Sequence, residues 1–469
     1  MPIIKKKIKG GKTTFYFLSL PVYRIKQGPE STKHYVLGIK TKTRKNKPAA
    51  FSGESRLQNA DGENAAAEKY REISSQLFNV YDSLNIHVNP RRPRMVNLLI
   101  PSIQPSLSAG PLSALHFGHF IQKQGYHVRV LVYMMNGADS QKLKEIISSQ
   151  EDSLKDFGKE IELEVLNTAA SPTLEISEND MSVAVLFNSS FFAHQIQSFC
   201  KNKKFINFIQ DDERCFFQGG SLYSVVEQSY DLDCYPIIST EILQQAFLAE
   251  DIGHFRSKNI RTIVQDSASN CFLPDWETFS RQHQHNECKK LVFYARPHIP
   301  RNCFELGLIS LIDACRKNVF SDEWQFYGVG FPEASSIPLG RGKELIMLPN
   351  MPVDQYKKML STFDIGLSLM STPHSNMPVI DFALSGNCVV TNCYKNKNQA
   401  ALSKICKNIF AADFNKDALV ETLRTAVKDC TDLEKRYQNA KASSHPTNWD
   451  DVFGEKHQKW LKDIMENHI

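Results

Sequence analysis

Residues 364–392, which read DIGLSLMSTPHSNMPVIDFALSGNCVVTN, predict the fold of this chain. The apolar run 365–369 has the length of a strand that is buried on both faces. A polar loop follows, then a helix that Pro378 opens and Gly386 ends, and then a second buried strand at 388–391. The order strand, loop, helix, strand predicts a parallel sheet with the helix N-terminus at its carboxyl edge. Ligands bind at that edge in open α/β sheets.

The start of this helix has two features that suit a nucleotide. The unpaired N–H groups near Pro378 and Val379, together with the helix dipole, can hold a phosphate. Asp381, which we expect in the first turn, is poorly placed for a phosphate but could accept hydrogen bonds from a ribose diol. An ordinary strand–helix–strand unit with an acid near its helix start has the same spacing, so these residues alone leave both interpretations open.

Composition bounds the class of protein. The 469 residues are 42% hydrophobic and 23% charged, which is typical of a globular protein with two or three domains. No apolar run approaches the ~20 residues that a membrane-spanning helix needs, and the basic N-terminus lacks the apolar stretch of a secretory signal. The 11 cysteines include no C-x-x-C pair, which indicates reduced thiols in a cytoplasmic protein rather than a disulfide framework or a zinc site.

Positive charge is concentrated at the N-terminus. Residues 1–48 contain 13 Lys or Arg and one acid, Glu30, which gives +12 against +5 for the whole chain and leaves −7 for the rest. Two similar pieces, 16–26 and 35–45, each have an aromatic and aliphatic strand followed by cations, which predicts a basic, β-hairpin-like arm. This arm could contact an anionic membrane surface or a partner protein, or be a solvated basic face. The acidic remainder of the chain disfavours nucleic acid.

The first half predicts one α/β domain, 95–280, preceded in 49–94 by a linker and an amphipathic helix. Alternating strands and helices begin at Val96–Ile100. The loop after this strand contains Gly110, which either lets the backbone approach a ligand closely or simply makes a turn. Polar side chains follow two later strands, where they either face an acceptor substrate or cap helices: Asn188, Gln210 and Asp211.

The second half predicts another α/β domain, 281–445, which begins with a strand at 291–294. Arg296 and Arg301 follow this strand directly. Guanidinium groups bind phosphate in a bidentate manner and stay charged at every relevant pH, so a pair of them at a strand's carboxyl end suits a diphosphate. Surface arginines near a helix start are also common.

Four blocks of the sequence resemble the rhamnosyltransferase family of GT-B glycosyltransferases that is typified by WsaF. The resemblance covers roughly residues 95–430, with the blocks in the family's order and spacing. The family's ribose-binding glutamate falls on Asp381, which keeps the charge on a shorter side chain. The matching blocks are Q-D-x-E at 210–213, Y-x-R-P-x-x-x-R-N at 294–302, T-P-H and the following helix with V-V-T-N within 372–392, and Y-x-N-K at 394–397.

The resemblance implies two Rossmann-like, doubly wound domains with an interdomain cleft, and a C-terminal helix in 446–469 that crosses back to the first domain. It implies a hexosyltransferase that moves a hexose, with rhamnose favoured, from a dTDP- or UDP-hexose to a growing, lipid-linked glycan, with retention and without a metal. His374 would contact the sugar, and no general base is assigned. The acceptor side would include Asn188, Gln210 and Asp211, and the donor would be bound by Gly110, Tyr294, Arg296, Arg301, Asn350, Pro378, Val379 and Asp381.

One departure from the family concerns the donor. The family has a lysine where this chain has Asn350, which predicts an altered donor affinity or a different donor, unless the nearby Lys343 substitutes for it. This change, with Asp381, is also compatible with a non-catalytic component of a polysaccharide synthesis complex that binds sugar nucleotides or glycans.

Two further sequence patterns concern other classes. A dinucleotide oxidoreductase would share the doubly wound sheet, but the sequence has no complete G-x-G-x-x-G. The D-x-D at 231–233 could hold a divalent cation, but it lies late in the first half, so we expect it at the surface. We expect a cytoplasmic protein, located at the inner face of the membrane if the basic arm binds lipid.

Overall fold

A computed structural model describes residues 84–105, 109–135, 137–166, 173–257, 261–284, 288–331, 335–349 and 351–466, together with five strands near the N-terminus. The chain forms two compact units, Met1–Glu72 and Ile73–Ile469, and each is described by itself. The amphipathic helix predicted before residue 84 lies outside the described residues. None of the helices within the described ranges combines the length and the hydropathy that crossing a membrane requires.

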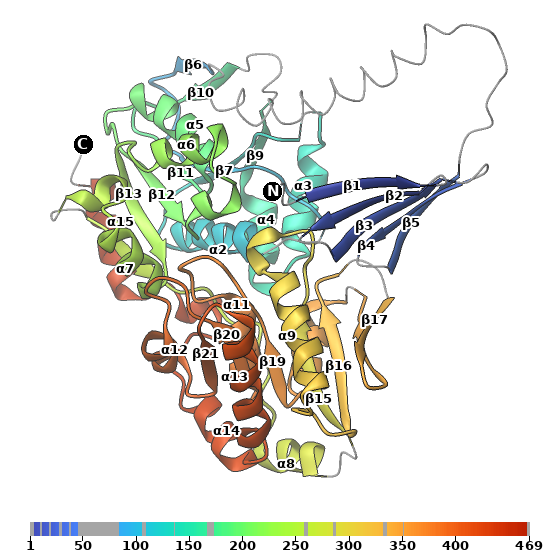
Figure 1. The fold of residues 1–469 in the computed structure, drawn as a ribbon. Coiled ribbons are helices and arrows are strands. Elements are labelled where there is room, and N and C mark those ends of the chain that lie inside the picture. The colour runs from blue at the N-terminus through green and yellow to red at the C-terminus, as the bar shows by residue number, and fades with distance from the viewer. Residues whose placement is uncertain are drawn as a thin grey trace, which may run out of the picture. The chain divides into compact units, whose positions relative to one another are not determined.

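The N-terminal unit contains a five-stranded antiparallel sheet in the order β1-β2-β3-β4-β5 (Figure 1). The predicted pair of strands with cationic tails is therefore wrong, because the lysines and arginines lie within the strands. The register aligns Lys9 with Lys12, Lys12 with Lys26, and Lys26 with Lys33, so four lysine positions form one row across four strands. The bounds are β1 Ile4–Lys9, β2 Lys12–Phe17, β3 Leu20–Gln27, β4 Ser31–Val36 and β5 Ile39–Lys45.

The first α/β domain is built on a parallel sheet in the order β14-β13-β12-β11-β7-β8-β9. Every pairing in it is parallel, and its five central strands are buried along their whole length, as is typical of parallel sheets. The strands are β7 Val96–Ile100, β8 Val128–Val132, β9 Glu162–Val165, β11 Met181–Ala184, β12 Phe205–Ile209, β13 Cys234–Ser239 and β14 Ile263–Gln265. The helices are α2 Ala109–Lys123, α3 Ser140–Ser148, α4 Lys155–Glu160, α5 Phe187–Ser198, α6 Ser221–Ser229 and α7 Glu241–Ala249.

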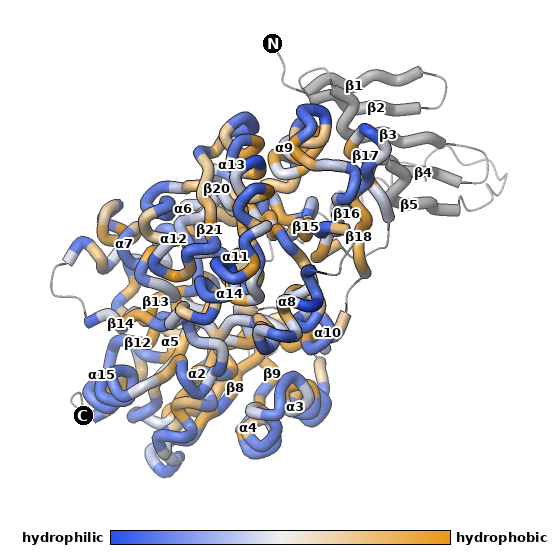
Figure 2. Tube along the Cα trace, turned by 90° about the horizontal axis from the view of Figure 1, so that it is seen from below, coloured by the Kyte–Doolittle hydropathy of each residue, from blue (hydrophilic) through white to orange (hydrophobic). Residues whose placement is uncertain are grey.

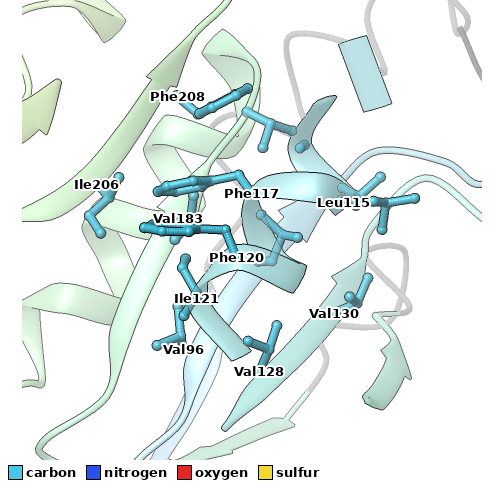
Figure 3. Close-up of a cluster of buried hydrophobic side chains, with 14 of the residues drawn as sticks. Val96, Leu115, Phe117, Phe120, Ile121, Val128, Val130, Val183, Ile206 and Phe208 are labelled. Carbon is cyan, nitrogen blue, oxygen red and sulfur yellow. The ribbon is translucent and has the colours of Figure 1, made fainter. Parts of the chain in front are cut away.

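Helices cover both faces of this sheet because alternate residues of a strand point to opposite sides. In β7, Leu98 packs in a cluster with α2, whereas Leu99 packs in a cluster with α5. Figure 3 shows the α2 side, where rings and aliphatic side chains of the helix lie over Val96, Val128 and Val183 of the sheet. A small parallel sheet of β6 (Asn85–Val88) and β10 (Thr173–Ile176) adjoins this domain, so the linker predicted for 49–94 extends too far.

The second α/β domain repeats the plan in the order β17-β18-β16-β15-β19-β20-β21, with only the edge strand β17 antiparallel. Together the two sheets confirm the predicted pair of doubly wound domains. The strands are β15 Lys289–Tyr294, β16 Trp324–Val329, β17 Ser335–Gly340, β18 Lys343–Met347, β19 Ile365–Leu367, β20 Cys388–Asn392 and β21 Ile409–Ala412. The helices are α8 Trp276–Gln284, α9 Phe304–Arg316, α10 Val353–Leu360, α11 Met377–Leu384, α12 Gln399–Ile405, α13 Lys416–Asp429 and α14 Leu433–Lys441.

The helix α8 moves the boundary between the domains. Its buried ring, Phe279, lies 5.3 Å from the ring of Tyr437 and beneath the guanidinium of Arg436, and its His283 Nδ1 is 3.0 Å from Asp364 Oδ1. All three partners belong to the second domain. The predicted boundary at 281 would cut this helix in two, so the division lies earlier, in the extended segment 266–275.

The C-terminal segment packs on the first domain. The helix predicted in 446–469 is interrupted: a short turn at Trp449–Asp451 is followed by Gly454 and then by α15, Glu455–Glu466. The ring of Phe453 lies 5.0 Å from that of Phe120 in α2, and Leu461 and Ile464 of α15 belong to the same core cluster. Figure 2 shows α15 as largely hydrophilic apart from this contact, as expected for a helix with one buried face.

Candidate functional site

The strand order reverses between β7 and β11 in the first sheet and between β15 and β19 in the second. In open α/β sheets the segments that leave the carboxyl ends of strands at such a reversal bind ligands. The segment 295–302 follows β15, and the loop 368–376 follows β19. In the first domain Gly110 lies in the first turn of α2, the helix that follows β7, and Asp211 follows β12. Arg301 contacts Asp211, so the carboxyl edges of the two sheets meet at this place.

Two arginines leave the carboxyl end of β15. Arg296 Nη1 donates a hydrogen bond of 3.1 Å to the hydroxyl of Tyr294. The guanidinium of Arg301 lies 4.0 Å from the ring centroid of Phe216, and its Nε is 4.0 Å from Asp211 Oδ2. Burial lowers the pKa of Arg301, an effect that Asp211 opposes and the positive charge of Arg296 reinforces. Because Arg301 Nε is buried and has no hydrogen-bond acceptor in the protein, the pair offers both charge and a free donor to an anion.

The loop after β19 is held by residues from three of the family's blocks. The N–H of Met370 donates to Asn392 Oδ1 at 2.7 Å, and Lys397 Nζ donates to the carbonyl of Met370 at 2.7 Å. The N–H of Ser371 donates to the carbonyl of Arg301 at 2.8 Å. A backbone hydrogen bond therefore joins the loop to the arginine segment.

His374 is the imidazole of this loop. Burial, followed by the positive charges of Lys397 and Arg301, lowers the pKa of His374 to about 3, so the ring is neutral. Its Nδ1 accepts the N–H of Asn376 at 3.0 Å, which assigns the ring proton to Nε2. The neutral ring thus has an N–H that can donate to a sugar hydroxyl.

The start of α11 differs from its prediction. The helix begins at Met377, so Asp381 lies in the second turn rather than the first. Pro378 has no N–H, and the N–H of Val379 donates to the carbonyl of Asn376 at 2.9 Å. Neither residue therefore has a backbone donor left for a phosphate, because the first turn is closed internally.

Asp381 holds the segment between the domains. Its Oδ1 accepts the hydroxyl of Ser269 at 2.8 Å and the N–H of Asn270 at 2.7 Å. Burial raises the pKa of Asp381 to about 6, although both hydrogen bonds oppose that shift. One carboxylate oxygen is therefore engaged by the protein, and a ribose contact would have to use the other.

The polar residues of the first domain form two groups. A Cβ added at Gly110 would lie 3.3 Å from Gln210 Oε1, so the glycine leaves space for this side chain. Asp211 is buried next to Arg301, and burial raises its pKa to about 7 while Arg301 opposes the rise. Asn188 is directed into the domain: its Oδ1 accepts the hydroxyl of Tyr133 at 2.7 Å and the N–H of Ser189 at 2.9 Å. Asn188 therefore supports the fold around the site.

Family models of the N-terminal and C-terminal domains of WsaF match residues 94–241 and 289–424, more than half of the chain. The chain belongs to the WsaF family of glycosyltransferases. The O-antigen biosynthesis protein RfbC of Myxococcus xanthus is 26% identical over 244 residues, which are 52% of this chain and 18% of that protein. This chain thus spans less than a fifth of the length of that relative.

Solved structures show the same fold. Sucrose-phosphate synthase from Thermosynechococcus elongatus has a TM-score of 0.53 at 11% identity, covering 79% of this chain and 99% of its own. HepE of Anabaena in complex with UDP-glucose has a TM-score of 0.54 at 12% identity with the same coverage. TarM has a TM-score of 0.54 at 9% identity and covers 81% of this chain and all of its own. The GT-B fold expected from the family motifs is confirmed.

Two charged residues of this WsaF-family site were not predicted. Glu213 is buried with its Oε2 accepting the N–H of Phe187 at 2.9 Å, and burial raises its pKa to about 8. Lys397 is fully buried beneath the loop 368–376. Both lie in family blocks, Q-D-x-E and Y-x-N-K, so the sequence marked their positions. It could not show that a Glu and a Lys would be buried, since charged residues are rarely found inside.

The remaining predictions concern Asn350, Lys343 and the D-x-D. Asn350 is outside the described residues. Lys343 is at the amino end of β18 and donates to the carbonyl of Ser321 at 2.7 Å, on the edge of the sheet away from the arginines, so it cannot replace a donor-site lysine. In the D-x-D, Asp231 forms an exposed ion pair of 3.0 Å with Arg256. Within the described ranges, no group of three or more His, Cys, Asp or Glu side chains is arranged to hold a metal ion.

Proposed function

We propose that this glycosyltransferase moves a hexose, with L-rhamnose favoured, from a dTDP- or UDP-sugar to a growing surface glycan, with retention of configuration. The observation that carries the proposal is the pair Arg296 and Arg301 at the reversal of the second sheet, with the buried Nε of Arg301 free of protein acceptors. A departing nucleoside diphosphate gains negative charge as the glycosidic bond breaks, and preorganised cations stabilise it there. Two supporting facts come from similar proteins: one carries the name O-antigen biosynthesis protein, and another is solved with UDP-glucose.

In this proposal each side chain acts where the geometry allows. The guanidinium groups of Arg296 and Arg301 bind the diphosphate, and the Nε2–H of neutral His374 donates to a hydroxyl of the transferred sugar. Asp381 contacts the ribose through the oxygen that Ser269 and Asn270 leave unused. Gln210, beside Gly110, faces the acceptor. The two guanidinium groups stabilise the negative charge of the leaving diphosphate, as a divalent metal does in metal-dependent enzymes, so the proposed reaction needs no metal.

Titration calorimetry with UDP and dTDP tests the proposal, after a thermal-shift screen of nucleotide sugars has identified the donor. Arg296→Ala should weaken binding of the diphosphate by about 10-fold or more, because a hydrogen bond to a charged group contributes about 1.5–3 kcal/mol. Unchanged affinity would refute the role of Arg296. The anomeric configuration of the product, read by NMR, tests retention.

A non-catalytic sugar-nucleotide-binding component is the second candidate, since the one carboxylate at α11 is largely engaged by the protein. Hydrolysis of the donor by the purified protein, absent in Arg301→Ala, would exclude it. Donor binding without any transfer or hydrolysis, across acceptors of the glycan class, would favour it over the transferase.

We also propose that the N-terminal sheet contacts an anionic membrane surface, where a lipid-linked acceptor would be found. The row of lysine positions at Lys9, Lys12, Lys26 and Lys33 supports this proposal. Like charges directly opposite each other destabilise a sheet, so such a row is stabilised when anionic headgroups lie against it. Each lysine near such a surface contributes roughly 1 kcal/mol.

A further inference from the structure

The sequence Gly328-Val329-Gly330, at the carboxyl end of β16, is a motif that the proposed roles above do not use. β16 pairs in parallel with β15, and the N–H of Ala295 donates to the carbonyl of Val329 at 2.8 Å, so the segments that leave the two strands lie side by side (Figure 1). A G-x-G without the third glycine is not a dinucleotide-binding motif. The two glycines therefore have another physical cause.

Each of these glycines leaves space for a different neighbour. A Cβ added at Gly328 would lie 2.3 Å from Met347 Sδ in the adjacent strand β18, so this glycine serves the packing of the sheet. A Cβ added at Gly330 would lie 2.8 Å from Cγ and 3.2 Å from Cδ of Arg296, and 3.5 Å from Cε2 of Tyr294. Gly330 thus leaves open the space that the aliphatic part of the Arg296 side chain occupies.

The backbone at Gly330 also favours glycine. Its φ is +90°, a region that residues with a Cβ rarely adopt. Gly340, at the end of β17 in the same domain, has a φ of +91°, but nothing lies within 4 Å of an added Cβ there. The two positions therefore have the same φ and differ in whether a neighbouring side chain uses the space.

The side chain of Arg296 is held at two points. Its aliphatic part packs against Gly330, and its Nη1 donates to the hydroxyl of Tyr294 at 3.1 Å. Within the described ranges this hydroxyl is the only hydrogen-bond acceptor of the guanidinium, so most of its five N–H donors remain available to an anion. A long side chain that is already restricted by packing loses less conformational entropy when it binds a ligand.

We propose that Gly330 is a positioning residue of the donor site. Because it carries no side chain, Arg296 can lie against the segment that follows β16, and this packing directs the guanidinium to the diphosphate. A side chain at position 330 would take that space and force Arg296 into another rotamer. This inference rests on the proposed function, because it presupposes a diphosphate at Arg296 and Arg301.

Titration calorimetry with UDP and dTDP compares Gly330→Ala with the matched control Gly340→Ala. Both variants should lower the melting temperature, because each places an alanine at a positive φ. Gly330→Ala should in addition weaken nucleotide binding by about 10-fold, because the displaced guanidinium loses charged hydrogen bonds to the diphosphate. Gly340→Ala should bind as the wild type does. Equal affinities of the two variants would overturn the role of Gly330.

A double-mutant cycle with Arg296→Ala separates positioning from a general effect on the fold. Arg296→Ala removes the atoms that an added Cβ would meet at 2.8 and 3.2 Å. In this background Gly330→Ala should change nucleotide affinity by less than about 2-fold. A further loss as large as that in the wild-type background would overturn the proposal, because residue 330 would then act independently of Arg296.

The double variant also covers the case in which Gly330→Ala does not fold. Without the crowded arginine it should fold, with a melting temperature close to that of Gly340→Ala. A double variant that is also unfolded would overturn the proposal, because the backbone alone would then require the glycine.

The outcomes distinguish this inference from the proposed function. Weaker nucleotide binding by Arg296→Ala together with unchanged binding by Gly330→Ala overturns the role of Gly330 alone. A wild type that binds neither UDP nor dTDP, or an Arg296→Ala variant that binds them as tightly as the wild type, overturns the role of Arg296 in the proposed function and this inference with it.

Discussion

Three carboxyl groups around the site are buried, and burial raises the pKa of each. The pKa of Asp381 rises to about 6, that of Asp211 to about 7 and that of Glu213 to about 8. Each group therefore changes charge near neutral pH, where ordinary carboxyl groups are fully ionised. The net charge of the site, and the strength of the contacts that these groups make between the two domains, therefore depend on pH.

Asp381→Asn isolates one of these groups. The folded-state pKa of Asp381 is above its ordinary value of 3.8, so its protonation stabilises the fold: this contribution is complete below that value and is lost as the pH rises through about 6. We expect the free energy of unfolding of the wild type to lose on the order of 2–3 kcal/mol from this group between pH 4 and pH 7. The amide of Asn still accepts from Ser269 and Asn270 but cannot ionise, so the variant should lack this loss.

Denaturant unfolding at several pH values gives the comparison, with Asp233→Asn as the control because Asp233 is an exposed acid. The difference in unfolding free energy between wild type and Asp381→Asn should change with pH, whereas that between wild type and Asp233→Asn should stay constant. Parallel curves for all three proteins would show that Asp381 is already ionised in the fold.

Arg301 offers a second test at this scale. Its guanidinium stacks on Phe216 and faces the site, and lysine cannot replace either its planar stacking or its bidentate binding. Arg301→Lys should therefore weaken UDP or dTDP binding in calorimetry by about 10-fold. Phe216→Leu should weaken it only a few-fold, since a cation–π contact contributes about 0.5–2 kcal/mol. Phe414→Leu, which changes an exposed phenylalanine far along the chain, is the control. Nucleotide binding by Arg301→Lys that is as tight as that of the wild type would contradict the bidentate role.

At the scale of elements, the sequence was informative where burial produces continuous apolar runs. β7 has the predicted bounds because a parallel strand that is buried on both faces leaves a local signal. α8 was missed since only Phe279 of its nine residues is buried, and its assignment to the second domain depends on contacts 81 or more residues away in sequence. The burial of Lys397 and Glu213 was not predicted for the same reason, because a buried charge is recognised only from its three-dimensional partners.

The close packing of β19 against α11 can be tested by adding a methyl group between them. A Cβ added at Gly366 of β19 would lie 2.4 Å from Phe382 Cδ2 of α11. Gly366→Ala should push the two elements apart and destabilise the second domain by about 1–3 kcal/mol, which is typical of overpacking. Because α11 carries Asp381, donor affinity should fall as well. Gly219→Ala, where an added Cβ has no neighbour within 4 Å, should leave both melting temperature and affinity unchanged; equal behaviour of the two variants would contradict the packing argument.

At the scale of the whole molecule, the two α/β domains are joined by polar contacts close to the site. Lys395 Nζ is 2.6 Å from Glu250 Oε1, Asn396 Nδ2 donates to the carbonyl of Ile242 at 2.6 Å, and Asp381 holds the connecting segment. Interfaces of this polar kind separate more readily than apolar ones. Donor exchange by domain movement is therefore compatible with a site assembled from both domains.

The N-terminal sheet is a separate unit, so its proposed membrane contact can be tested without disturbing the site. Lys12 and Lys26 are paired in the lysine row, whereas Lys6 and Lys42 occupy positions of the opposite parity in their strands, which the register assigns to the other face. The double variant Lys12→Gln with Lys26→Gln should bind anionic vesicles roughly 30-fold more weakly in a flotation assay, at roughly 1 kcal/mol per cation. The double variant Lys6→Gln with Lys42→Gln has the same net charge and should weaken vesicle binding much less. Equal losses in the two double variants would mean that total charge rather than one face binds lipid. If the full-length wild type does not bind anionic vesicles but binds RNA, the ligand of this sheet is a nucleic acid rather than a membrane. Nucleotide affinity should be the same in all of these variants, because the arginine site lies in the other unit.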